Sequence, residues 1–227
     1  MKLDKRLSAI AEFCDKVEVT ADIGSDHGKL GLTLLNSGKT EMLIATDISA
    51  PSLEKTTKLL KGNFDGRFDC RVGDGLSTIT PADNVNQLII AGMGGREICN
   101  ILNGGKSLLV QAQVLVLQPM RDVSKVRKAL STHNFKIVRD IVVQDKTKYY
   151  HILKAVHGCE ALSEKQLEFG ADAGEYVTVA FQSWLLMREQ KVLGVLNKST
   201  GATKINNKLI ADNRQLLKCI CELKIKE

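Results

Sequence analysis

The sequence predicts an α/β fold in which a nucleotide-binding parallel sheet is followed by a pair of long helices. An apolar run over 17–23 leads into a glycine turn and then into a helical stripe of leucines, the order strand, tight turn, helix. Near residue 157 the short runs give way to long segments with heptad spacing. The 227 residues are therefore predicted to form two domains, over 1–157 and 158–227.

Apolar periodicity and turn residues predict alternating strands and helices in the first domain. The predicted helices cover 3–14, 27–36, 53–61, 96–102 and 121–130. The predicted strands cover 17–23, 42–47, 68–72, 87–91 and 114–117, and a β-hairpin over 135–144 and 149–156 finishes the sheet.

In the second domain, apolar residues recur every seven positions on two segments. They are Val179, Leu186 and Leu193 on the first segment and Leu209, Leu216 and Leu223 on the second. The polar segment 198–201 separates them. This pattern predicts two antiparallel helices packed as a coiled-coil hairpin.

The turn after the first strand carries two carboxylates where a dinucleotide site would carry glycine amides. Gly24 permits a backbone angle closed to other residues, and Gly28 is expected to let the helix pack close to the strand. Asp26 replaces the middle glycine of the usual pattern, and Asp22 precedes the turn. These acids would repel a pyrophosphate, and they suit a cationic cofactor without phosphate, such as S-adenosylmethionine.

Two further strand ends carry acids that suit a nucleoside. Asp47 ends the second strand and can accept hydrogen bonds from both ribose hydroxyls. Asp74 follows the third strand and can accept the exocyclic amine of adenine, although an ordinary turn would carry the same residues. The predicted cofactor-binding residues are Asp22, Gly24, Ser25, Asp26, His27, Gly28, Asp47, Asp74, Gly75 and Gly92.

A glycine-rich loop, 92–95, follows the fourth strand. It leaves space for a flat group and offers unobstructed amides at a strand end, where the ligands of open α/β sheets bind. A flexible loop is the alternative. Gly92, Met93 and Gly94 are the predicted catalytic residues.

The net charge of +6 is concentrated in one segment. Residues 121–156 hold nine basic and three acidic side chains. Such a concentration is typical of a polyanion-binding face, although a solvated surface would look the same. The predicted RNA-binding residues are Arg121, Lys125, Arg127, Lys128, Lys146 and Lys148.

Other classes of protein are disfavoured by what the sequence lacks. No apolar run reaches the roughly 18 residues that span a bilayer, and the N-terminus lacks the apolar core of a secretory signal. The six cysteines are scattered, which predicts free thiols in a cytoplasmic protein. No His and Cys spacing suggests zinc, so neither a metal nor a membrane is expected as a partner.

Four motifs together resemble the bacterial tRNA (adenine-22-N1)-methyltransferases. They are D-I-G-S-D-H-G at 22–28, G-D-G-L at 73–76, A-G-M-G-G at 91–95 and Q-P-M at 118–120. The resemblance implies a Rossmann-like class I methyltransferase sheet of seven strands and a coiled-coil C-terminal domain. Helices about 30 Å long could extend the binding surface along an RNA arm, so residues 158–227 are expected to recognise tRNA, although they could instead seal the sheet or mediate dimerisation. It also implies transfer of a methyl group from S-adenosylmethionine to N1 of adenosine 22 in the D-arm of tRNA.

The same motifs bear on the chemistry. Adenine N1 carries a lone pair and can attack the sulfonium methyl directly, so no general base is strictly required, and His27 is not assigned that role. Enzymes that methylate the N6 amine commonly carry a D/N-P-P-Y/F loop where 91–95 stands here, which favours the ring nitrogen. A methyltransferase-fold protein acting on another RNA or a small molecule, and a non-catalytic RNA-binding module, are the alternatives.

Overall fold

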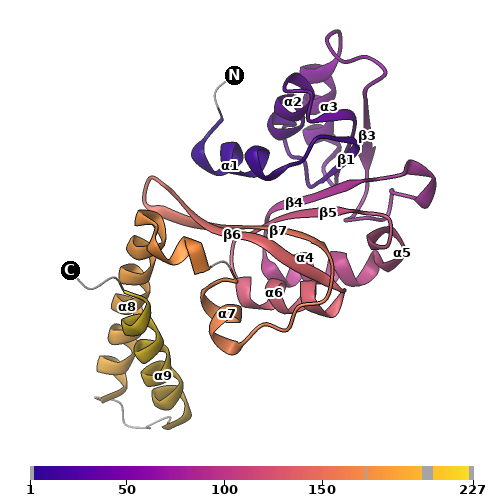
Figure 1. Cartoon of the computed structure of the whole chain (residues 1–227). Helices are drawn as coiled ribbons and strands as arrows, with labels where there is room; N and C mark the ends of the chain where they lie inside the picture. Colours follow the sequence, from indigo (N-terminus) through magenta and orange to yellow (C-terminus); the bar gives the residue numbers. More distant parts are fainter. Residues whose placement is uncertain (1–2, 172, 201–206, 225–227) are drawn as a thin grey trace. The chain divides into compact units, whose positions relative to one another are not determined.

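The computed structural model describes residues 3–171, 173–200 and 207–224. Figure 1 follows the chain through its elements. The chain divides into two compact units, Met1–Ala171 and Asp172–Glu227. The boundary therefore lies later than the predicted one after residue 157.

The first unit is built on one seven-stranded sheet of order β3-β2-β1-β4-β5-β7-β6. Strand β1 pairs in parallel with both β2 and β4, so the order of the strands switches direction there. The last strand, β7, inserts antiparallel between β5 and β6. The strands are β1 (Val17–Ile23), β2 (Thr40–Asp47), β3 (Phe68–Val72), β4 (Gln87–Met93), β5 (Val114–Pro119), β6 (Phe135–Asp145) and β7 (Lys148–His157).

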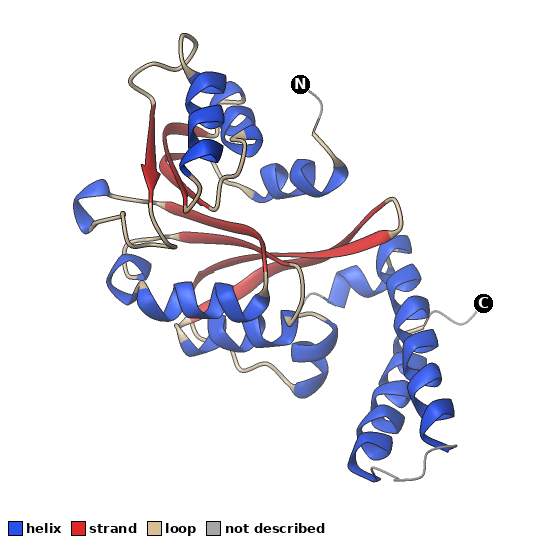
Figure 2. Cartoon of the chain, turned by 180° about the vertical axis from the view of Figure 1, so that it is seen from behind, coloured by secondary structure: helices blue, strands red, loops and turns tan. Residues whose placement is uncertain are grey.

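Helices cover both faces of this sheet (Figure 2). They are α1 (Lys5–Phe13), α2 (Lys29–Asn36), α3 (Ala50–Leu60), α4 (Gly95–Gly104), α5 (Lys106–Leu109), α6 (Val123–Thr132) and α7 (Glu164–Phe169), with a 3-10 turn η1 (Pro81–Asp83). The predicted strands and longer helices of this unit are all present, with shifted ends. Helix α2 begins at Lys29 because Gly28, its N-cap, has a left-handed backbone with φ of 68°.

The two faces of the sheet bury alternate residues of the same strands. Leu88 and Ile90 of β4 belong to one apolar cluster, which also contains Ile98 of α4 and Leu130 of α6. Ile89 points the other way, into a cluster with residues of α1 and α2. The continuous apolar runs predicted as buried strands are explained by this two-sided burial.

The segment 158–171 belongs to the sheet unit because its polar groups bond there. Arg127 Nη1 of α6 donates to the Leu167 carbonyl at 2.8 Å, and the Ala171 amide donates to Asp140 Oδ2 at 2.9 Å. The Ser131 hydroxyl donates to the Glu160 carbonyl at 2.5 Å. These bonds attach α7 to α6 and β6, which sequence periodicity does not reveal.

The second unit is a helical hairpin of α8 (Val179–Thr200) and α9 (Asn207–Leu223), preceded by the 3-10 turn η2 (Ala173–Val177). Gln182 Nε2 donates to the Leu223 carbonyl at 2.9 Å, so the end of α9 lies beside the start of α8. The helices are antiparallel, as predicted. The connection from 201 to 206, which includes part of the predicted turn, lies outside the described residues.

The predicted heptad seam of α8 is wrong. Val179, Leu186 and Leu193 are 83%, 48% and 41% exposed, whereas Leu185 and Val192 are buried. Those two are also seven residues apart, so heptad spacing fits either stripe. Large aromatic side chains decide between them: Phe181 stacks on Tyr176 and contacts Trp184, with ring centroids 4.9 and 5.4 Å apart.

Candidate active site at the carboxyl edge of the sheet

A cleft of about 430 Å³ opens where β1, β2 and β4 end. It brings together nearly all the predicted cofactor and catalytic residues. Those lining it are Asp22, Gly24, Ser25, Asp26, His27, Asp47, Asp74, Gly75, Gly92 and Met93. Gly28 and Gly94 do not line the cleft.

Two glycines of the turn after β1 are required by different neighbouring side chains. Gly24 has φ of 71°, and a Cβ there would collide with the Met93 side chain, which fills the space. Gly28 was expected to allow close packing of helix and strand. Instead, a Cβ on Gly28 would lie 2.5 Å from Thr56 Cγ2, so the missing side chain allows helix α3 to pack close to this turn.

Backbone amides hold the Asp47 carboxylate in place. Its Oδ2 accepts from the Asp26 amide at 3.0 Å and its Oδ1 from the Ser49 amide at 2.8 Å. Each oxygen keeps a lone pair for a ligand. The Asp47 carboxylate can therefore accept hydrogen bonds from two ribose hydroxyls.

Asp22 is buried in the cleft floor, 3% exposed, and no side-chain or amide donor contacts its carboxylate among the described residues. Burial, and secondarily the charge of Asp47, raise its pKa from 3.8 to about 7. A buried carboxylate without a partner is costly unless a cation binds beside it. The ammonium and sulfonium groups of S-adenosylmethionine are cations of the kind this site can hold.

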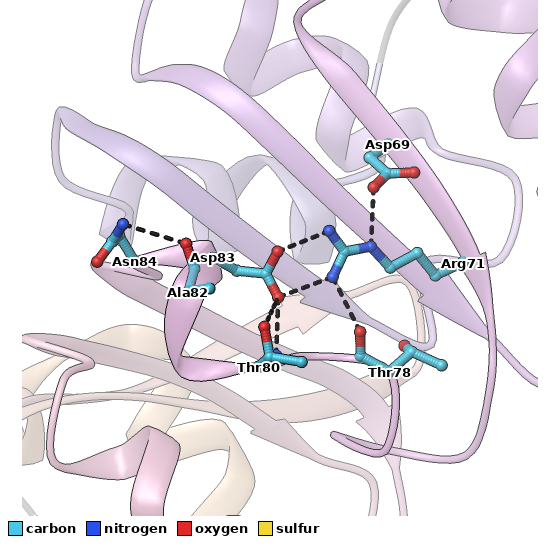
Figure 3. A network of polar contacts seen from close by, with 7 residues as sticks. All are labelled: Asp69, Arg71, Thr78, Thr80, Ala82, Asp83 and Asn84. Carbon is cyan, nitrogen blue, oxygen red and sulfur yellow. Dashed lines mark hydrogen bonds and ion pairs between the residues drawn. The ribbon is translucent and has the colours of Figure 1, made fainter.

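A network on Arg71 holds the loop that carries Asp74 (Figure 3). Arg71 Nη1 and Nη2 donate to the two oxygens of Asp83 at 2.8 and 2.7 Å, and Nη1 also donates to the Thr78 carbonyl at 2.9 Å. The guanidinium holds the pKa of the Asp83 carboxyl well below its usual range. The network ties Arg71 to Thr78 and Asp83 across the loop that carries Asp74 and Gly75. Sequence reasoning missed it because the partners follow no motif.

The glycine loop after β4 is bonded to the segment after β5. The Met120 amide donates to the Met93 carbonyl at 2.8 Å, and the Gly95 amide donates to the Arg121 carbonyl at 3.0 Å. A Cβ on Gly95 would lie 2.5 Å from that same Arg121 carbonyl oxygen. A Cβ on Gly94 would lie 3.3 Å from Arg121 Nε. Gly92 and Met93 thus face the cleft, whereas Gly94 lies against the Arg121 guanidinium.

The sequence analysis did not assign a role to two residues at the Gly92 end of the glycine loop, Arg6 of α1 and Gln118 of β5. Arg6 lines the cleft, and its Nη1 donates to Gln118 Oε1 at 2.9 Å. The same oxygen accepts from the Gly92 amide at 3.2 Å. The Q-P-M motif was a signal for Gln118, whereas Arg6 occupies one turn of an ordinary amphipathic helix and had none.

The basic segment divides into buried and exposed cations. Arg127 was expected to bind RNA, but it is 0% exposed and pairs with Asp140, Nε to Oδ2, at 2.8 Å. Lys128 of α6 is exposed, and so are Arg121 and Lys125, although Lys125 pairs with Asp122 at 3.0 Å.

The tip of the β6–β7 hairpin adds two further exposed cations, Lys146 and Lys148. Strand β6 runs antiparallel to β7, which is itself antiparallel to β5. The tip therefore lies at the same edge of the sheet as the cleft. In the described part of the chain, no three His, Cys, Asp or Glu side chains gather as a metal site would require, and no helix is long and apolar enough to cross a membrane.

Comparison with known proteins agrees with this geometry. Residues 3–153 match the model of the methyltransferase domain family. The tRNA (adenine(22)-N(1))-methyltransferase of Bacillus subtilis is 29% identical over 96% of both chains. A Mycoplasma genitalium protein named "putative tRNA methyltransferase" is 31% identical over 66% of this chain and 68% of its own.

Solved structures extend the likeness to the whole chain. A Streptococcus pneumoniae protein in complex with S-adenosyl-L-methionine superimposes with a TM-score of 0.87 at 26% identity, covering 98% of this chain and 99% of that one. The m1A22 tRNA methyltransferase of B. subtilis superimposes with a TM-score of 0.87 at 25% identity over 98% of both chains. The chain therefore belongs to the bacterial tRNA (adenine-22-N1)-methyltransferase family, whose catalytic domain is a class I methyltransferase domain.

Proposed function

We propose that this protein transfers the methyl group of S-adenosylmethionine to N1 of adenosine 22 in the D-arm of tRNA. The proposal rests on one cleft. It holds Asp22, whose carboxylate no described donor contacts, and Asp47, which two amides hold, and the loop beside it has no side chain at Gly92. When bound, the cofactor supplies a methyl group activated by a sulfonium.

Each carboxylate contacts a different part of the cofactor. Asp74 accepts from the adenine amine, Asp47 accepts from the ribose hydroxyls, and Asp22 faces the cationic end. The Arg71–Asp83 network and the two amides on Asp47 hold these groups in place before the cofactor arrives. Such preorganisation lowers the ordering cost of binding.

The loop after β4 suits a nucleophile that brings its own lone pair. Gly92 has no side chain, and Met93 presents a thioether that takes no proton. Adenine N1 would attack the methyl carbon with its lone pair. As the N–C bond forms the S–C bond breaks, its electrons return to sulfur and S-adenosylhomocysteine leaves, while the ring takes a positive charge that the acidic cleft favours. The protein's contribution is then in-line placement of a flipped-out base and exclusion of water.

The exposed cations of the first unit are proposed to contact tRNA phosphates. Arg121 precedes α6, Lys125 and Lys128 lie on α6, and Lys146 and Lys148 lie at the β6–β7 tip. A helical hairpin about 30 Å long can extend this contact along an RNA arm. We assign tRNA recognition to residues 172–227 on that basis. With tRNA as its substrate, the enzyme would act in the cytoplasm.

The direct test is to map the methylated nucleotide on tRNA treated with purified protein and labelled cofactor. We expect 1-methyladenosine at position 22, and no label on a tRNA with guanosine there. A label on another nucleotide, or on N6, would favour the alternative of a methyltransferase with another RNA substrate. Absence of label on any tRNA, with S-adenosylmethionine bound, would contradict tRNA methylation.

The role of the hairpin is tested by truncation after Ala171, where the sheet unit ends. An earlier cut after residue 158 would remove Leu167 and Ala171, which bond to Arg127 and Asp140. We expect the 1–171 protein to bind S-adenosylmethionine normally, because the cleft residues all precede the cut, and to lose most tRNA affinity. Full-length rates of tRNA methylation by this protein would remove the hairpin from substrate recognition.

A further inference from the structure

Two guanidinium groups lie against opposite ends of the glycine loop, Arg6 beside Gly92 and Arg121 beside Gly94. A Cβ on Gly92 would lie 3.5 Å from Arg6 Nη1, and a Cβ on Gly94 would lie 3.3 Å from Arg121 Nε. Only Arg6 lines the cleft. Arg121 is exposed and does not line the cleft, so the two cations lie in different surroundings.

Arg6 and Lys29 are cations in the lining of a mainly acidic cleft. Five carboxylate side chains line the cleft, from Asp22, Asp26, Asp47, Asp74 and Glu97. None of them pairs with Arg6, whose only described contacts are the bond to Gln118 and the Tyr150 ring, 5.7 Å from the guanidinium carbon. Arg6 is half-buried, and Asp4 fixes its helical turn by capping α1 through the Leu7 amide at 2.7 Å.

The charges of S-adenosylmethionine match those of the cleft. The cofactor carries two cationic groups and one anion, the α-carboxylate of its methionyl end. Asp74 and Asp47 mark the adenine and ribose positions, so the methionyl end lies toward Asp22 and Gly92, where Arg6 lines the cleft. We infer that Arg6 binds the cofactor's α-carboxylate and that this contact selects cofactors that retain the carboxylate. This inference rests on the proposed cofactor.

The guanidinium suits this role because it donates in a planar fork that matches a carboxylate. One donor, Nη1, already bonds to Gln118 Oε1, and the remaining donors have no described acceptor. Gln118 is 0% exposed and bonds to the Gly92 amide through the same oxygen. It therefore acts as a positioning residue that orients Arg6 and the glycine loop together.

The test compares S-adenosylmethionine with decarboxylated S-adenosylmethionine, which keeps both cations and lacks only the carboxylate. Calorimetry on the full-length protein gives both dissociation constants. We expect the wild-type protein to prefer the carboxylated cofactor by roughly 10- to 150-fold, the range for a charge-assisted hydrogen bond. Arg6→Met should bring this ratio close to one, and Arg6→Lys should keep part of it because one charge remains.

Lys29→Met is the matched control, because Lys29 lines the same cleft from α2 and the change removes the same charge. It should leave the ratio unchanged. Loss of discrimination in Lys29→Met but not in Arg6→Met would overturn the assignment. Both ligands are measured on the same protein. If a substitution displaces the loop, it weakens the binding of both ligands, and the ratio of their dissociation constants still reports on the carboxylate.

Gln118→Leu should lower the ratio less than Arg6→Met does, since the guanidinium remains but loses its orienting bond. A wild-type protein that binds both ligands equally would refute the role of Arg6 and leave the proposed function standing. A wild-type protein that binds neither would refute the proposed cofactor itself.

Discussion

The two halves of the sheet's carboxyl edge carry opposite charge. Around the ends of β1, β2 and β3 lie Asp22, Asp26, Asp47 and Asp74. Beyond the ends of β4, β5 and β6 lie exposed Arg96, Arg121, Lys125 and Lys146. The division follows the ligands, because the proposed cofactor is a net cation and the proposed substrate is a polyanion.

A charged side chain on this edge indicates a ligand only when its burial and its partners are considered together. On the acidic half, Asp22 is buried and no donor among the described residues contacts its carboxylate, which suits a site for a cation. On the basic half, Arg127 is equally buried but has a full set of partners, which indicates a structural role.

Replacing Arg127 by Met should give the largest loss of stability. The change leaves Asp140, 3% exposed, without its ion-pair partner, and removing one member of a buried pair costs about 3–5 kcal/mol. Denaturant unfolding measures this loss. Arg121→Met, in the same basic segment but exposed, should change stability by no more than about 0.5 kcal/mol and weaken tRNA binding instead. Equal stability of the two variants would contradict the division into buried and exposed cations.

Asp22 should make the protein less stable as pH rises from about 4 to about 7. The unfolded carboxyl has its usual pKa of 3.8 and the folded one about 7, so the folded state binds the extra proton in this window. Stability present at low pH is then lost as pH rises through the window. Asp22→Asn should flatten this dependence and leave the apo protein more stable at pH 8, by on the order of 2–4 kcal/mol.

The same substitution should reduce cofactor affinity, because only the ionised carboxylate attracts a cation. In the wild-type protein, S-adenosylmethionine should bind more tightly at pH 8 than at pH 6, and the variant should lose this pH dependence. Calorimetry at both pH values is the measurement. A variant that binds cofactor like the wild type at pH 8 would remove Asp22 from the cationic end of the site.

Asp47→Ala should weaken cofactor binding by about 1.5–3 kcal/mol, roughly 10- to 150-fold, through loss of charge-assisted bonds to ribose. Affinity for tRNA should barely change, since Asp47 lies on the acidic half. Asp65→Ala is the control: this carboxylate also accepts a backbone amide, from Gly62 at 3.0 Å, but does not line the cleft. Unchanged cofactor affinity in Asp47→Ala would exclude it from the site.

The smallest expected effect concerns two lysines of α6. Replacing Lys125 and Lys128 by Ala should make the slope of log tRNA affinity against log salt shallower by up to about 1.4–1.8, with the smaller share from Lys125 because Asp122 already neutralises it. The matched pair is Lys58, in the last turn of α3, and Lys61, its C-cap; both are exposed and neither lines the cleft. Replacing this pair should leave the slope unchanged, and equal slopes in both double variants would show that the basic half is only a solvated surface.

Local sequence determined the elements and the acidic half of the site. Strand, turn and helix follow from short-range periodicity and glycine positions, so β1, its turn and α2 were predictable, and Asp47 followed from its spacing. The cysteines, too, are free thiols as predicted. Parallel strand ends meet at one edge of a sheet, which brought Asp22, Asp47 and Asp74 together without knowledge of any long-range contact.

Tertiary structure decided the features that depend on contacts between residues far apart in the sequence. Arg127 and Lys128 are neighbours in the sequence, yet one is buried against Asp140 and the other exposed, because helix α6 packs with only one face on the sheet. Arg6 and Gln118 are 112 residues apart and meet only when α1 lies over the ends of β4 and β5. The seam of α8 was settled by how Phe181 and Trp184 pack, because heptad spacing is satisfied by two stripes and only packing distinguishes them.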